Sequence, residues 1–271
     1  MESSLIETIW FSEKRRKILL LLLDGPKDPE EMKKAFGVPW RSLILPLKEL
    51  KEEELVCNSE GAYKLSDIGK IIAESVRPIE SILNLFEKDT DYWVKRDMKA
   101  IPQNLLDRIG EIEDCIIAEP DLNDMFEPST EFTTALLGSK HVYSLFSIYH
   151  PMYSPLYIGL AEKGTKISIV LTEPVFKRMK EDRPEEIEKM LHSETMELFL
   201  FKKELFPPSI AVTDNLFFAS FFNSHGMYDH RDIMSFSQSS LKWGEDLFKH
   251  YQKMADKIPN YESLDDNSNM K

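Results

Sequence analysis

Residues 30–65 of this 271-residue chain contain the pattern that most restricts how it can fold. A helical segment over residues 30–36 stops at a glycine, and a second helical segment spans residues 40–51. Two short apolar stretches, 55–58 and 62–65, are separated by a glycine-containing turn and predict a two-stranded ribbon. Helix, tight turn, helix and ribbon is the order of a winged helix-turn-helix, whose second helix can enter a DNA major groove.

Capping residues indicate where the helices of this domain begin and end. A helix over about residues 4–23 precedes the motif, and Asp28 followed by Pro29 predicts the start of the next helix. In the segment 40–51, Pro46 removes a backbone donor, which predicts either a kink or a later start. The residues expected to face inward are Met32, Ala35, Phe36, Leu43, Leu47 and Leu50.

The side of residues 40–51 opposite this apolar stripe carries the predicted DNA contacts. Arg41 is the one residue there able to read guanine bidentately, whereas Ser42 and Lys48 more often contact phosphate. Ile44 and Leu45 suit thymine methyl groups, or equally the surface of another protein. The remaining predicted contacts are Tyr63 and Lys64 on the ribbon and Lys14 and Arg15 on the first helix, although a basic run is usually a solvated face.

The placement of charge decides how far the acidic composition opposes DNA binding. The net charge is −13, whereas DNA-binding surfaces are normally basic. Residues 1–86 hold 13 basic and 15 acidic residues, so most of the excess acid lies in residues 87–271. The N-terminal domain is therefore compatible with DNA binding of modest non-specific affinity.

Composition and cysteine usage narrow the class of protein further. With 42% apolar and 30% charged residues the chain is typical of a globular protein. The longest apolar run, residues 18–23, is too short to cross a membrane, and the start of the chain does not resemble a signal peptide. Cys57 and Cys115 have no closely spaced partner, so neither a zinc site nor a disulfide framework is expected. We expect a cytoplasmic protein without a cofactor.

The sequence predicts four segments. They are a winged helix-turn-helix domain over residues 1–66, a helical linker over 67–100, an α/β domain over 101–256 and a flexible tail over 257–271. Apolar residues in the linker follow a heptad pattern interrupted by Pro78, and they are Ile72, Val76, Ile79, Leu83 and Phe86. This seam fits packing within the chain and a homodimer contact equally well. A dimer would match DNA half-sites related by a two-fold axis.

Strands and helices alternate in the α/β domain, and one of its loops carries the densest set of titratable residues. The predicted ligand contacts there are Tyr228, Asp229, His230, Arg231 and Asp232. Residues that follow the predicted strand 142–147 would form the opposite wall, and they are Tyr149, His150 and Tyr153. The loop suits an anionic ligand or, less well, a divalent metal, but a capped turn with exposed histidines explains it at least as well.

Several stretches resemble a known family. The segment 47–56 is similar to the end of the third helix in winged-helix repressors, but Glu54 stands where glycine is usual. The chain also resembles archaeal regulators of filament formation and methanogenesis, a DNA-binding head fused to a sensor domain. The resembling stretches are residues 91–93, 101–110, 120–122, 149–151, 228–236 and 241–245.

The same resemblance extends, more loosely, to phospholipase-D-like sensor domains. None of the six histidines is followed two residues later by lysine, as the enzymes of that fold require. Gly-x-Ser-x-Gly and His-Glu-x-x-His motifs are also missing. The residues therefore do not predict catalysis.

These observations favour a transcriptional regulator with an α+β winged helix-turn-helix followed by an α/β sensor domain. Its expected partners are double-stranded DNA, a second copy of itself and an unknown small-molecule effector, without a membrane. A phosphodiesterase-like enzyme and a protein-interaction adaptor with a docking winged helix are the alternatives.

Overall fold

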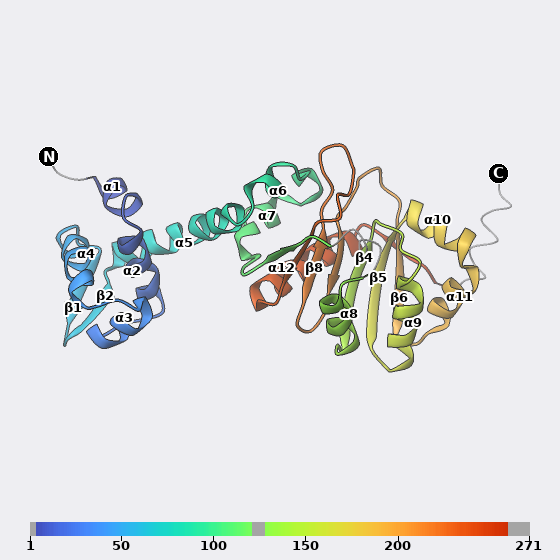
Figure 1. Ribbon diagram of the computed structural model, residues 1–271, viewed down its shortest axis with the longest axis horizontal. Helices are drawn as coiled ribbons and strands as arrows, with labels where there is room; N and C mark the ends of the chain where they lie inside the picture. Colours follow the sequence, from blue (N-terminus) through green and yellow to red (C-terminus); the bar gives the residue numbers. More distant parts are fainter. Residues whose placement is uncertain (1–3, 121–127, 260–271) are drawn as a thin grey trace. The chain divides into compact units, whose positions relative to one another are not determined.

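The computed structural model describes residues 4–120 and 128–259. By contacts between residues, the chain divides into two compact units, with the boundary between Leu83 and Asn84. No helix of the described residues is both long enough and apolar enough to cross a membrane. The fold class is the predicted one, an α+β winged helix followed by an α/β unit (Figure 1).

The N-terminal unit contains the helix-turn-helix and ribbon that the sequence predicted. Its elements are α1 (Leu5–Trp10), α2 (Glu13–Leu23), α3 (Pro29–Phe36), α4 (Arg41–Glu52), β1 (Val56–Ser59), β2 (Ala62–Leu65) and α5 (Asp67–Glu87). Asp28 caps α3 as expected, because its carboxylate accepts hydrogen bonds from the backbone nitrogens of Glu30 and Glu31, both 2.8 Å long.

One core holds these helices and the ribbon together. Leu43, Leu47 and Leu50 of α4 are at most 1% exposed and pack with residues of α2, α3 and α5. Pro46 lies inside α4 without ending it, so the late start considered above is wrong.

Three local expectations for this unit are wrong. The predicted first helix is two helices, because Ser12 caps α2 by accepting a hydrogen bond from the backbone nitrogen of Arg15. Ala35 is exposed rather than inward-facing. The ribbon turn contains two residues instead of three, since Glu60 and Gly61 both have positive φ, as tight hairpins require.

Glu54 connects α4 to β1 in a left-handed backbone conformation, with φ of +57°. A residue with a β-carbon pays about 1–2 kcal/mol for this conformation, whereas glycine adopts it without steric cost. The position at which related repressors usually carry glycine is therefore strained in this chain.

We expect Glu54→Gly to raise the free energy of unfolding of the N-terminal unit by about 1 kcal/mol, because it removes this strain. Thermal or denaturant unfolding followed by circular dichroism measures the change. The control is Glu53→Gly at the neighbouring residue, where φ is −85°, which should leave stability unchanged or lower it. Equal effects of the two substitutions would contradict the explanation.

Helix α5 crosses the boundary between the units and divides the predicted heptad seam. Val76 is buried and Ile72 is half-buried against the winged-helix core, so these two pack within their own unit. Ile79 and Leu83 are exposed, at 45% and 44%. The helix continues through Pro78.

The C-terminal unit is built on an eight-stranded mixed sheet with the strand order β10-β6-β5-β4-β7-β8-β9-β3. Its strands are β3 (Ile116–Ala118), β4 (His141–Phe146), β5 (Lys166–Thr172), β6 (Met196–Phe201), β7 (Ser209–Val212), β8 (Phe217–Ser220), β9 (Asp232–Ser235) and β10 (Asp256–Lys257). Strands β4, β5 and β6 are parallel, and all the other pairs are antiparallel.

Helices cover both faces of this sheet. They are α6 (Thr90–Val94), α7 (Gln103–Leu106), α8 (Thr130–Leu137), α9 (Tyr153–Glu162), α10 (Glu173–Asp182), α11 (Pro184–His192) and α12 (Gln238–Gln252), with short 3-10 turns at Met98–Ala100 and Ile109–Glu111. Neighbouring residues of β4 point to opposite faces. Ser144 contacts the hydroxyl of Tyr157 on α9 at 2.6 Å, and Tyr143 packs on Phe248 of α12.

Side chains on each face of the sheet pack against the helices that cover it. Residues of α8, α9, α10 and α11 form one buried core with one face of the sheet. On the other face, the indole nitrogen of Trp243 in α12 donates to the carbonyl of Leu105, and the hydroxyl of Tyr251 donates to that of Ala100.

Three expectations for the C-terminal unit are also wrong. Ser237, not Ser240, caps α12. Asp232 begins strand β9, which the sequence did not predict. The tail was predicted from residue 257, but Lys257 pairs with Phe199 and Ile258 is buried; the rest of the predicted tail, from residue 260, lies outside the described residues.

Candidate functional site

The outward side of α4 is the first candidate surface. Arg41 and Lys48 are exposed on it, and between them Ile44 and Leu45 are 49% and 61% exposed. Ser42 is half-buried, and its hydroxyl donates to the carbonyl of Pro39 at 2.9 Å. Ile44 and Leu45 therefore form an exposed apolar pair between two cations on the side of α4 that the sequence predicted to contact DNA.

The other predicted DNA contacts differ in how accessible they are. Lys64 and Lys14 are exposed, and Tyr63 is half-buried against the ring of Trp40. Arg15 differs from the prediction, because its guanidinium forms an ion pair with Glu49 and donates to the carbonyl of Thr8. These bonds tie α2 to α1 and α4, so Arg15 is a structural residue.

The second candidate is a cavity of about 780 Å³ in the C-terminal unit. Its floor is the face of β4, β7, β8 and β9, and its walls come from α8, the start of α9 and the segments around Pro120, Ile148 and His230. Six of the eight predicted ligand residues line it, and they are Tyr149, His150, Tyr153, Tyr228, His230 and Asp232. The structure thus places the two predicted walls around one space.

Asp232 is the polar centre of the cavity. One of its carboxylate oxygens accepts a hydrogen bond from Ser220 at 2.6 Å, and the hydroxyl of Tyr228 lies 2.9 Å from both oxygens. Burial raises the pKa of Asp232, although these hydrogen bonds and the nearby His230 oppose the shift. Burial and the charge of Asp232 also raise the pKa of Tyr228, so this hydroxyl stays protonated and donates.

Aromatic rings form most of the remaining wall. Phe132 lies 4.7 Å from Phe218 and 6.0 Å from Tyr153, measured between ring centres. His150 stacks on Tyr153 at 4.7 Å, and burial raises the pKa of this tyrosine. The cavity therefore combines an apolar wall with one deep carboxylate, the usual composition of a small-molecule site.

Asp229 and Arg231 differ from the prediction because they do not line the cavity. Asp229 forms a bidentate ion pair with Arg96, whose side chain is fully buried. Arg231 forms an ion pair with Asp89, and both guanidinium groups lie near the ring of Tyr92. Alternate residues of the loop thus face the cavity and the α6 region.

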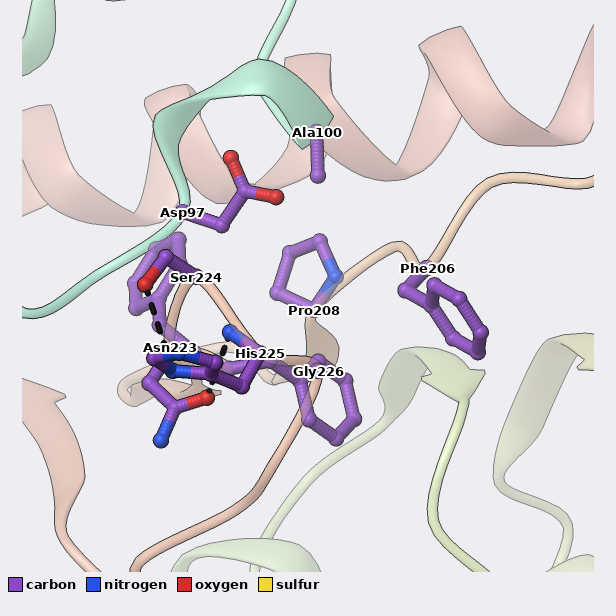
Figure 2. Close-up of a pocket in the computed structure, with 10 residues that line it drawn as sticks. Asp97, Ala100, Phe206, Pro208, Asn223, Ser224, His225 and Gly226 are labelled. Atoms are coloured by element: carbon purple, nitrogen blue, oxygen red, sulfur yellow. Dashed lines mark hydrogen bonds between the residues drawn. The ribbon is translucent and has the colours of Figure 1, made fainter.

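A smaller cavity of about 320 Å³ is lined by residues 221–226, which precede this loop, and by Asp97, Ala100, Phe206 and Pro208 (Figure 2). Figure 2 shows His225 in its wall, where the backbone nitrogen donates to the side chain of Asn223 at 2.9 Å. This hydrogen bond closes a turn through Asn223, and His225 is exposed, as the capped-turn alternative expected of the histidines. That alternative is wrong about the caps, because Asp229 pairs with Arg96 and Asp232 belongs to β9. Within residues 4–120 and 128–259, no three His, Cys, Asp or Glu side chains gather where they could hold a metal ion.

Several residues of the large cavity were not predicted from the sequence. Ser220, Phe132, Phe218 and Met234 line it, and they come from α8, β8 and β9. Only the alternation of Phe218 and Ser220 along one strand hints at a shared face.

Comparison with known proteins gives two matching family models. The N-terminal domain of the methanogenesis regulatory protein FilR1 matches residues 4–85, and the middle domain of the same protein matches residues 125–254. The curated FilR1 protein of Methanothrix harundinacea (strain 6Ac) is 20% identical over 249 residues. This alignment covers 90% of the chain but 56% of that protein, so the chain spans about half the length of its relative.

Two of the matching solved structures have low TM-scores and low sequence identities to this chain. The archaeal chromatin protein TrmBL2, described with a novel mode of DNA binding, has a TM-score of 0.42 and 12% identity; the alignment covers 93% of this chain and 97% of TrmBL2. A dimethyltransferase from Streptomyces davawensis has a TM-score of 0.21 and 13% identity, with coverages of 70% and 61%. Both TM-scores are below 0.5, so these similarities indicate nothing about the function of this chain.

The fold and the two sites define a two-domain protein with a winged-helix head and an α/β domain that encloses a ligand-sized cavity. The two matched models are domains of one protein, and together they cover more than half of the chain. The chain belongs to the family of the methanogenesis regulatory protein FilR1.

Proposed function

We propose that this protein is a DNA-binding transcriptional regulator that reads DNA with the outward side of α4. The observation that carries the proposal is the exposure of Arg41, Ile44, Leu45 and Lys48 on that helix, while its opposite stripe is buried. Lys64 on the ribbon would contact the backbone beside the groove, with Ser42, Tyr63 and Lys14 as further candidates. The regulatory name of the related FilR1 supports the proposal.

Arg41→Ala is expected to weaken binding to the preferred DNA site by about 1–3 kcal/mol, because it removes the one bidentate base contact. Fluorescence anisotropy with DNA from the chain's own promoter, over a series of salt concentrations, measures the loss. Arg77→Ala is the matched control, since this arginine lies on α5 and pairs with Asp24 at 3.2 Å. Equal loss in both variants would show that Arg41 contributes charge alone.

The exposed Ile44 and Leu45 keep one alternative open, a protein-interaction adaptor with a docking winged helix. Absence of salt-sensitive DNA binding at any salt concentration, together with a folded N-terminal unit, would favour that adaptor. The family and the missing His-x-Lys motif support a protein that is not an enzyme. The likeness of the C-terminal unit to phospholipase-D-like domains stays a prediction.

We propose in addition that the large cavity senses a small molecule and that the chain acts as a homodimer. The exposed apolar residues of α5 support the dimer, and they are Ile68, Ile71, Ile79 and Leu83. A ligand that favours one arrangement of the C-terminal units would shift the spacing of the two α4 helices. Light scattering that reports a monomeric mass with and without DNA would contradict the dimer.

A further inference from the structure

Two histidines, His150 and His230, line the large cavity, and its other charged lining residues are all acidic. The acidic residues that line it are Glu119, Glu131 and Asp232, and none of its described lining residues is a lysine or arginine. Glu119 and Glu131 are exposed at the rim, whereas Asp232 lies deeper. Carboxylates placed in this way attract cations and repel anions.

Two guanidinium groups beside the wall of the cavity are already paired with carboxylates. Arg231 is held by Asp89 and lies 3.8 Å from Glu119. Arg178, 5.9 Å from the ring centre of Tyr149, pairs with Asp182 at 2.8 Å. An anionic ligand, which the sequence suggested, would therefore find no lysine or arginine among the described lining residues, and the nearby His230 already acts on the carboxylate of Asp232.

The interior of the cavity suits a positive nitrogen attached to an apolar body. Two hydroxyl groups donate to Asp232, and a carboxylate offers about four acceptor sites, so capacity remains for a ligand donor. Aromatic faces such as those of Phe132, Tyr153 and Phe218 attract cations electrostatically. A volume of about 780 Å³ exceeds what a single small ion needs.

We propose that the cavity binds an apolar organic amine whose protonated nitrogen pairs with Asp232 and whose hydrocarbon body packs against the aromatic wall. The proposal rests on the sensor role proposed above and names the ligand's chemistry. Such a ligand would add a third donor to Asp232 and stabilise its ionised form, which burial opposes.

Isothermal titration calorimetry of the full chain with three probes of equal length tests this chemistry. The probes are 4-phenylbutylammonium, 4-phenylbutanol and 4-phenylbutyrate. We expect the ammonium probe to bind about tenfold more tightly than the alcohol, as a charged hydrogen bond implies, and the carboxylate probe not to bind. Equal binding of all three, or binding of none, would overturn the proposal.

Asp232→Asn should remove the advantage of the ammonium probe and leave the alcohol's affinity nearly unchanged. Asp256→Asn, in an exposed ion pair with Lys202, is the matched control and should keep the advantage. The probe series on the unaltered chain keeps the proposal testable even if Asp232→Asn does not fold. DNA binding, measured separately without any probe, decides the regulator proposal independently of this result.

Discussion

We expect Asp229→Ala to lower the free energy of unfolding of the C-terminal unit by about 3–5 kcal/mol. Asp229 neutralises Arg96, whose side chain is 0% exposed, whereas Asp229 itself is 35% exposed. Removing the carboxylate leaves the buried positive charge of Arg96 without a partner, and an unpaired buried charge is strongly destabilising. The carbonyls of Tyr92 and Phe221 accept from Arg96 at 3.1 and 3.0 Å, but they do not neutralise it.

A double-mutant cycle and a surface pair separate this effect from a general loss of charge. Arg96→Met combined with Asp229→Ala should recover part of the lost stability, because no buried charge remains. Asp256→Ala breaks an ion pair whose members are 55% and 76% exposed, and it should cost about 0–1 kcal/mol. Denaturant unfolding of Asp229→Ala, Arg96→Met, their combination and Asp256→Ala, each compared with the natural chain, provides the measurement. A cost for Asp229→Ala no larger than that of Asp256→Ala would contradict the argument.

The pH dependence of this pair has a definite sign. Partial burial raises the pKa of Asp229, but the hydrogen bond and charge of Arg96 outweigh burial and lower the pKa overall. A carboxyl group with a lowered pKa in the folded state contributes stability above its unfolded pKa and loses it as pH falls through the folded value. The difference in free energy of unfolding between the natural chain and Asp229→Ala should therefore be largest at neutral pH and should decrease in acid.

The sequence alone predicted some elements and only part of the site. Local signals were sufficient for α3, because Asp28, Pro29 and Glu31 define a helix start within four residues. The two walls of the cavity were also predictable, since both follow strands of one domain. Which members of the loop 228–232 face the cavity was not predictable, because Arg96 lies 133 residues before its partner Asp229.

Strand β9 was missed for a related physical reason. It contains four residues and pairs between β8 and β3, so its stability comes from neighbours rather than from its own pattern. From the sequence, Asp232 was therefore interpreted as part of a turn. It is the first residue of β9, and the position of β9 beside β8 brings its carboxylate to Ser220.

Gly69 gives no signal in the sequence, yet the structure leaves no room for a side chain there. It lies in the first turn of α5, and a β-carbon at this position would lie 1.9 Å from the carbonyl oxygen of Leu55. That carbonyl accepts a hydrogen bond from the backbone nitrogen of Ser66 at 3.0 Å, and the hydroxyl of Ser66 caps Gly69 in turn. The obstacle is backbone held by hydrogen bonds, so it cannot move aside as a flexible side chain would.

We expect Gly69→Ala to destabilise the N-terminal unit by about 3 kcal/mol, near the upper end of the range for overpacking, because α5 must move away from Leu55. Gly159→Ala is the matched control, since Gly159 also lies within a helix but has open space around it. Alanine is the better helix former, so this variant should gain about 0.5–1 kcal/mol in the C-terminal unit. Thermal unfolding measures both changes, and hydrogen exchange of residues 41–65 assigns the loss to the winged helix. Similar stability of Gly69→Ala and the natural chain would mean that α5 is not locked against Leu55 and could move relative to α4.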